Sequence, residues 1–290
     1  MWDCFLDALV DTLNILPILF LVYVITNMIS HSENFGKIIL KSKKFGPLFA
    51  SALGIFPQCG FSSAMADMFS KRYITIGSLF AVFIATSDEA FAVLVAYPNF
   101  VLNLLLLLAI KFVLAVIVGY AIDLCTKKWF SYASGDQMPE RHHCHCNILV
   151  ESFFESIKIG LYILIATFII NFILSIFSLE SISNFVGNNI FLQPVITALV
   201  GIIPNCASSV LLVTMYVNGI IHFGSLVGGL SAGSGVGILV LFKNNKNIKQ
   251  NIIITVSMIL IGIASGIIIN LVELLFWLKS KIHLNIQLWG

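Results

Sequence analysis

Asp88 and Glu89 are the residues of this chain whose chemistry is hardest to explain by packing. They lie in the segment "ATSDEA" (85–90), inside an apolar run that extends over 74–97. An ionised side chain near the middle of a bilayer costs about 2.5–3.5 kcal/mol even on the lenient insertion scale. Two adjacent acids there are expected to face a cavity, bind a cation, carry a proton or pair with a base.

Lys111 is a base at the matching depth, in the middle of the apolar run 100–124. The short turn at 97–99 joins the two runs, so we expect antiparallel neighbours. At 1.5 Å per residue, Lys111 and Asp88 should then lie within about 5 Å of each other in depth. We predict an ion pair between Lys111 and Asp88 or Glu89 that leaves a residual negative charge. The alternative is a lysine that snorkels to the interface.

Proline, glycine and cysteine interrupt two further apolar runs, at "GIFPQCGFSS" (54–63) and "GIIPNCASSV" (201–210). Carbonyls that end a half-helix can bind a cation, and amides that open the next can bind an anion. The mixture of soft sulfur and hard oxygen does not select one ligand, and each cysteine can instead be a small buried residue. The candidate ligands at the two tips are Gln58, Cys59, Ser62 and Ser63, and Asn205, Cys206, Ser208 and Ser209.

The segment "RHHCHCN" (141–147) concentrates soft metal ligands in a polar loop. Such tracts bind zinc-class or softer metals, but this spacing is too tight for one rigid site. We interpret it as a flexible metal-collecting or sensing loop, with an incidental polar loop as the alternative. Its ligands are His142, His143, Cys144, His145 and Cys146.

Other acidic residues are better explained without a ligand. Asp67 precedes Lys71 by four residues, which predicts a solvated i,i+4 pair at the base of a hairpin. Asp3, Asp7 and Asp11 share one helix face, which is expected to be solvated.

The composition requires a membrane environment for these residues. Of 290 residues, 59% are hydrophobic and 10% charged, and the mean hydropathy is +1.00, whereas a soluble domain has about 25% charged residues. The apolar runs are continuous, which predicts an all-α polytopic membrane protein. Long spans are expected at 6–29, 74–97, 100–124, 153–178, 221–242 and 251–278. The interrupted stretches 46–70 and 191–218 have halves too short to cross, so we predict re-entrant hairpins.

Basic residues predict the orientation in a plasma or inner membrane. Lysines in the 30–46 loop and bases in the 125–150 loop place both loops inside. The N-terminus is then outside, the first hairpin enters from the inside, and the second enters from the outside.

A shift of 147 residues aligns 47–95 with 194–242 without a gap, with 15 of 49 positions identical. Ser87 aligns with Ser234, whereas Asp88 and Glu89 align with Gly235 and Val236. Each copy has an odd number of crossings, so the copies are expected to be inverted. We predict repeats at 1–124 and 151–290, joined by a cytoplasmic linker at 125–150. Inverted repeats with broken helices are typical of secondary transporters, whose site lies at the midplane.

The segments "GIFPQCGFSSAMADMF", "IATSDEAF" and "GIIPNCASSV", with the His/Cys loop, resemble a family of predicted ten-segment heavy-metal exporters. This family is also described as arsenic-efflux-like or as manganese transporters. The resemblance covers nearly the whole chain. It implies export of a metal or metalloid without singling out manganese.

Three functions follow from these patterns. The leading one is a secondary transporter that exports a divalent metal cation, with manganese as one candidate. Its site is expected to include Ser87, Asp88, Glu89 and Ser234. The second is a metalloid or anion permease that uses the hairpin cysteines and helix N-termini. An intramembrane enzyme or a gated channel is the third, and the repeat argues against the enzyme. We expect no cofactor and no nucleic acid; the expected partners are the substrate and the bilayer, and a homo-oligomer stays open.

Overall fold

The computed structural model describes residues 45–55, 59–86, 88–126, 148–176 and 191–287, together with separate positions between 6 and 24. Every element in these ranges is a helix, as predicted. The side chains of Cys59, Asp88, Glu89 and Cys206 lie outside the description, although their backbone belongs to helices.

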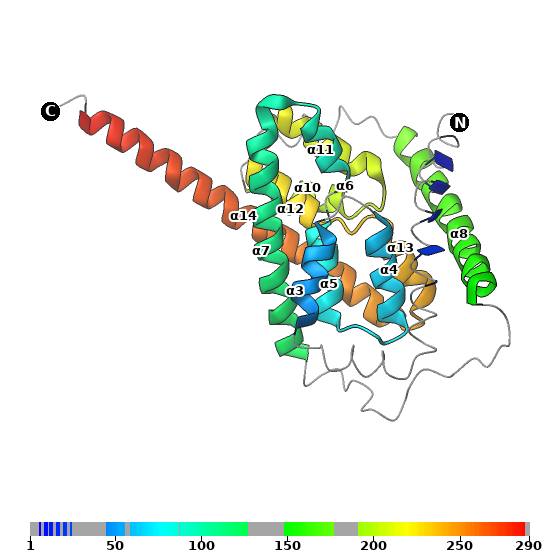
Figure 1. Ribbon diagram of the computed structural model, residues 1–290. Helices are drawn as coiled ribbons and strands as arrows, with labels where there is room; N and C mark the ends of the chain where they lie inside the picture. Colours follow the sequence, from blue (N-terminus) through cyan, green and yellow to red (C-terminus); the bar gives the residue numbers. More distant parts are fainter. Residues whose placement is uncertain are drawn as a thin grey trace.

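Along the chain, the described helices fall into two groups separated by one connecting helix, which lies at the edge of the molecule (Figure 1). The first group is α3 (Gly46–Gly54), α4 (Cys59–Ser70), α5 (Ile76–Ala85), α6 (Asp88–Val95), the short 3-10 helix η2 (Pro98–Phe100) and α7 (Val101–Thr126). The connecting helix is α8 (Ile148–Ile176). The second group is α10 (Gln193–Gly201), α11 (Cys206–Val217), α12 (Phe223–Ala232), α13 (Gly237–Asn244) and α14 (Ile248–Gln287).

The outer surface of the described helices is apolar. Leu102 is 76% exposed and Ile117 is 62% exposed, both on α7. Within the described residues, four stretches are long and apolar enough to cross a membrane: 101–126, 152–169, 223–244 and 248–275. Leucine and isoleucine exposed on long helices are stable in lipid but not in water, so the protein is a polytopic membrane protein.

Two helical hairpins occupy the stretches where the sequence is interrupted. A Cβ added to Gly46 would meet Ser78 near the start of α5, and one added to Gly54 would meet Ala85 at its end. Helices α3 and α5 therefore run parallel, and α4 must return between them. In the second group, Gln193 accepts a hydrogen bond from Ser225 near the start of α12, and α11 returns in the same way. Their re-entry into the membrane stays a prediction.

The helix bounds recur at the shift of 147 residues. Helices α3, α4 and α5 begin and end at the positions that match α10, α11 and α12, and α7 begins where α14 does. The packing recurs as well, because α5 lies against α3 and α7, and α12 lies against α10 and α14. The close approach of Gly77 to the Gly119 carbonyl is repeated by Gly224 and the Gly266 carbonyl. The opposite orientation of the two halves in the membrane stays a prediction.

The second arm of each hairpin packs against the other half of the chain. Helix α4 lies against α13, and α11 lies against α6. Figure 1 shows α11 and α6 towards one end of the molecule and α4 and α13 towards the other. Neither group is therefore a separate unit.

The predicted continuous spans 74–97 and 221–242 are wrong in detail, because both are broken. The first is interrupted between α5 and α6, and the second between α12 and α13. At Thr86 the backbone turns to ψ 129°, and the hydroxyl donates to the Val82 carbonyl at 2.8 Å. In the second break, Gly233 leaves the helix with ψ 120° and Gly235 has φ +54°. Threonine bonding back to its own helix and glycine at positive φ both favour a break.

The N-terminal span 6–29 is described only at separate positions. Phe20 lies edge-on to Phe153 of α8, with ring centroids 6.2 Å apart, so this part of the chain contacts α8. The acids Asp3, Asp7 and Asp11, the His/Cys loop at 142–146 and the 125–150 linker from residue 127 to 147 lie outside the described residues.

Candidate functional site: the breaks around Lys111

Lys111 joins the ends of two broken helices. It belongs to the buried stripe of α7, where its neighbours are Leu104, Leu107, Ala115 and Gly119. Its ammonium donates to the Thr86 carbonyl, just past α5, and to the Leu230 carbonyl in the last turn of α12, the latter at 2.9 Å. The carbonyls at a helix C-terminus carry partial negative charge and favour a cation. Because α5 and α12 belong to different halves, Lys111 links the halves at their broken helices.

The burial of Lys111 decides between the two predictions made for it. The residue is 1% exposed, so the snorkelling alternative is wrong. Its contact with Thr86 also supports the predicted depth, since Asp88 lies two residues further along. The predicted ion pair with Asp88 or Glu89 stays a prediction, because those side chains lie outside the described residues.

Two serine hydroxyls are buried beside the second break. Ser231 is 0% and Ser234 1% exposed, and among the described residues neither hydroxyl has a hydrogen-bond partner. Buried hydroxyl groups in proteins almost always have a partner, and an exception calls for an explanation. Ser234 was predicted from its match with Ser87, which is itself outside the description. Ser231 was missed, although the glycine-rich segment around it could have drawn attention to it.

The tip of the first hairpin lies against the start of α13. A Cβ added to Gly237 would be 2.9 Å from the backbone of Ser62, so the two chains touch there. Ser62 and Ser63 are both buried, and their predicted role as substrate ligands stays a prediction. Gln58 lies outside the described residues, as does the side chain of Cys59.

At the second tip, two predicted ligands have structural roles. Asn205 accepts a hydrogen bond from the Ala207 amide at 3.1 Å and so caps the N-terminus of α11. The Ser208 hydroxyl donates to the carbonyls of Asn205 and Ile203 at 2.7 and 3.1 Å. These bonds hold the turn at the second tip. Ser209 is half-buried, and the Cys206 side chain is not described.

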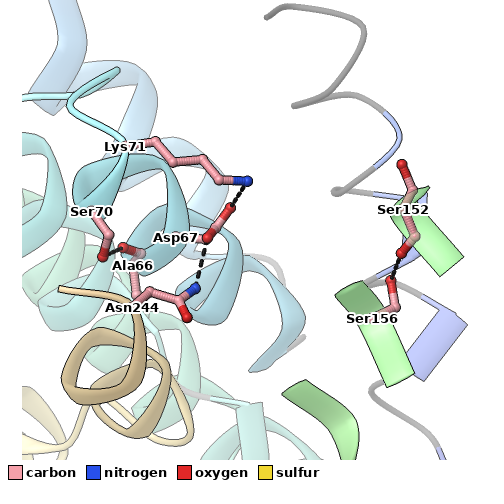
Figure 2. A network of polar contacts seen from close by, with 7 residues as sticks. All are labelled: Ala66, Asp67, Ser70, Lys71, Ser152, Ser156 and Asn244. Atoms are coloured by element: carbon pink, nitrogen blue, oxygen red, sulfur yellow. Dashed lines mark hydrogen bonds and ion pairs between the residues drawn. The ribbon is translucent and has the colours of Figure 1, made fainter. Parts of the chain in front are cut away.

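Asp67 lies at the other end of the α4–α13 contact. It pairs with Lys71 at 3.0 Å, as predicted, and accepts a hydrogen bond from Asn244 of α13 at 2.7 Å (Figure 2). The prediction that it is solvated is wrong, since Asp67 is 2% exposed. The partner that the sequence did not reveal, Asn244, comes from the other half of the chain.

Asp123 is a structural acid that the sequence reading missed. Its carboxylate accepts 2.8 Å hydrogen bonds from the Thr75 hydroxyl and the Gly77 amide at the start of α5. A carboxylate is stabilised at a helix N-terminus. The matching residue Asn270 donates to Ser225 at the start of α12, at 2.9 Å. The sequence signal that could have revealed Asp123 is its alignment with another polar residue, Asn270, at the shift of 147 residues.

The described side chains do not by themselves form a ready metal centre. Within them, no group of three or more His, Cys, Asp or Glu residues lies close enough to hold an ion. The oxygens gathered at the breaks are therefore carbonyls and hydroxyls. The acids and cysteines that would complete a site belong to the side chains that are not described.

A comparison with known proteins identifies the family of this chain. A family profile described as "Putative, 10TM heavy-metal exporter" matches residues 3–177 and 146–286, which together span nearly the whole chain. The chain belongs to this family. No match is found among curated proteins, and none among solved structures. Family membership makes this protein a metal-efflux transporter of the membrane.

Proposed function

We propose that this exporter carries a divalent heavy-metal cation by alternating access, at a site between the two hairpin tips and the two helix breaks. Manganese is our first candidate. Around the breaks, the described donors are carbonyl and hydroxyl oxygens, and oxygen ligands suit Mn²⁺ better than the softer metals.

The observation that carries this proposal is the contact of buried Lys111 with the ends of α5 and α12. Unwound backbone at membrane depth is tolerated only where it is buried or lines a cavity. In secondary transporters, such breaks hold substrates and coupling ions between two repeats. Here the breaks of both halves share one side chain, which supports a common site.

Asp88 and Glu89 are proposed to supply its negative charge. They open α6, and Asp88 lies two residues beyond Thr86, whose carbonyl Lys111 contacts. One acid paired with Lys111 would leave the other to attract a divalent cation. The proposed shell is completed by Gln58, Ser62, Ser63, Ser87, Asn205, Cys206, Ser208, Ser209 and Ser234.

The proposed transport cycle uses the two halves as inverted repeats, 1–124 and 151–290, with the 125–150 linker in the cytoplasm. Each hairpin would open the site to one side in turn. The His/Cys loop at 142–146 is proposed to collect metal at the inner face before transport.

The test is metal flux in vesicles that contain a variant with Asp88→Asn and Glu89→Gln. The amides keep the shape but remove the charge, so we expect Mn²⁺ flux to fall about 10–100-fold. Glu273→Gln, an exposed acid on α14, is the matched control and should transport like the wild type. Unchanged flux in the double variant, with normal folding, would disprove the proposed role of the acids.

A second candidate is efflux of a trivalent arsenical, and one observation favours it. Cys59 and Cys206 occupy the first positions of α4 and α11, at matching places in the two hairpins. A helix N-terminus favours the thiolate that binds such a ligand. Cys59→Ser with Cys206→Ser should then abolish arsenite flux, whereas Mn²⁺ flux should survive these substitutions if oxygen ligands carry the metal.

A further inference from the structure

The ammonium of Lys111 contacts backbone carbonyl oxygens at the C-terminal ends of two helices, α5 and α12. Its ammonium lies 2.9 Å from the Leu230 carbonyl and also contacts the Thr86 carbonyl. Both carbonyls are at C-terminal ends, where the last turn leaves carbonyls without helical partners. Their partial negative charges converge from two directions on one cation.

Oxygens of this kind bind free cations in other transporters. Unwound carbonyls and half-helix C-termini coordinate a monovalent coupling ion where helices are broken. An ammonium group satisfies the same oxygens at 2.7–2.9 Å through charge-assisted hydrogen bonds. The breaks of α5 and α12 thus have the chemistry of a monovalent cation site that is filled by a side chain.

Its charge distinguishes Lys111 from the neighbouring residues on α7 and from the matching residue in the second half. The other members of its stripe on α7 are apolar or glycine. The matching residue in the second half is Met258, which is buried on α14. A side chain of this length can therefore pack at such a position without any charge.

We propose that Lys111 is a built-in monovalent cation, whose ammonium takes the place of a free ion between the ends of α5 and α12. Removing the side chain converts the position into a site for a small free cation such as K⁺ or ethylammonium. The inference goes beyond the exported substrate, because it concerns how the broken helices are held together. It also implies that the wild-type protein needs no Na⁺ or K⁺ at this position.

The test is chemical rescue of a purified Lys111→Ala variant of the full chain in detergent. Its melting temperature is measured against ethylammonium, K⁺ and Na⁺ at constant ionic strength, in the absence of transported metal. A ligand that binds only the folded state raises the melting temperature in a saturable way. We expect ethylammonium or K⁺ to raise it by about 5 °C near saturation.

Met258→Ala is the matched control, since it also opens space at the equivalent buried position. It should lose stability without rescue by any of the three cations, and the wild type should not respond either. Equal rescue of Met258→Ala, or no rescue of Lys111→Ala by any cation, would overturn the proposal. This readout does not use flux, so its failure is distinct from failure of the proposed metal export.

A second variant keeps the proposal testable if Lys111→Ala does not fold. Lys111→Gln retains hydrogen-bond donors for the two carbonyls but lacks the charge. The proposal expects a lower melting temperature than in the wild type. A Lys111→Gln protein as stable and as active as the wild type would show that the charge is not needed.

Discussion

Asp67 and Lys111 are the two charged side chains that the described part of the chain buries, and their partners differ in kind. Asp67 is held by the side chains of Lys71 and Asn244. Lys111 contacts backbone carbonyls at helix breaks. The first arrangement fixes α4 against α13, whereas the second joins the broken helices around which the proposed transport site lies. We therefore expect substitution of Asp67 to affect stability more than transport.

Asp67→Ala tests this expectation at the residue scale. The change leaves the half-buried Asn244 amide without its acceptor and removes the ion pair of the buried carboxylate, so the free energy of unfolding should fall by about 1–3 kcal/mol. Thermal unfolding of the purified protein measures it. Lys246→Ala, at an exposed position between α13 and α14, is the control and should stay within about 0.5 kcal/mol. Flux per folded molecule should persist; its complete loss would contradict a structural role.

The helices α5 and α12 are equivalent elements whose first turns are held differently. Asp123 accepts from Thr75 and Gly77 at the start of α5, while Asn270 contacts Ser225 at the start of α12. The carboxylate adds an interaction with the helix dipole that an amide lacks.

Asp123→Asn replaces the carboxylate at the start of α5 with an amide like that of Asn270 at the start of α12. We expect a loss of about 1 kcal/mol, or roughly 2–4 °C in melting temperature. The reciprocal change Asn270→Asp shows whether an acid is tolerated at the matching position. An Asp123→Asn protein as stable as the wild type would show that the charge adds nothing at the start of α5.

A second prediction at the element scale concerns the break between α12 and α13. Gly235 has φ +54° and open space around its Cα, and Gly219, in the turn before α12, has φ +71° and open space as well. Alanine should cost about 1–2 kcal/mol at either position, because the left-handed conformation is strained for residues with a Cβ. We expect similar losses in melting temperature but reduced metal flux only for Gly235→Ala. Equal flux in both variants would mean that the shape of the break is not important for transport.

The hairpins could be predicted from sequence, but the break in the 74–97 span could not. Matched prolines and cysteines at Pro57, Cys59, Pro204 and Cys206 interrupt apolar runs and reveal the tips. The 74–97 run contains no proline or glycine near Thr86 except Gly77, so its hydropathy predicts one helix. The partners of Lys111 are carbonyls, which every residue has, and only the fold brings them together. The fixed rise of an α-helix allowed the depth of Lys111 to be predicted near that of Asp88, and its contact with the Thr86 carbonyl is in line with that prediction.

At the scale of the whole molecule, the orientation in the membrane has a direct test. Cys125, near the end of α7, is exposed, and the predicted topology places it on the cytoplasmic side. In a variant whose only cysteine is Cys125, a membrane-impermeant thiol reagent should label it only after the cells are permeabilised. Labelling of intact cells would reverse the predicted orientation of both hairpins.

The exchange of hairpin arms between the halves has a consequence for biosynthesis. Helix α4 ends at Ser70, but α13, against which it packs, is complete only at Asn244. At a synthesis rate of about 5–20 residues per second, α4 waits roughly 10–30 s for its partner. During that interval the newly made first hairpin, with its buried Asp67, must be sheltered by lipid, by the insertion machinery or by temporary contacts within the growing chain.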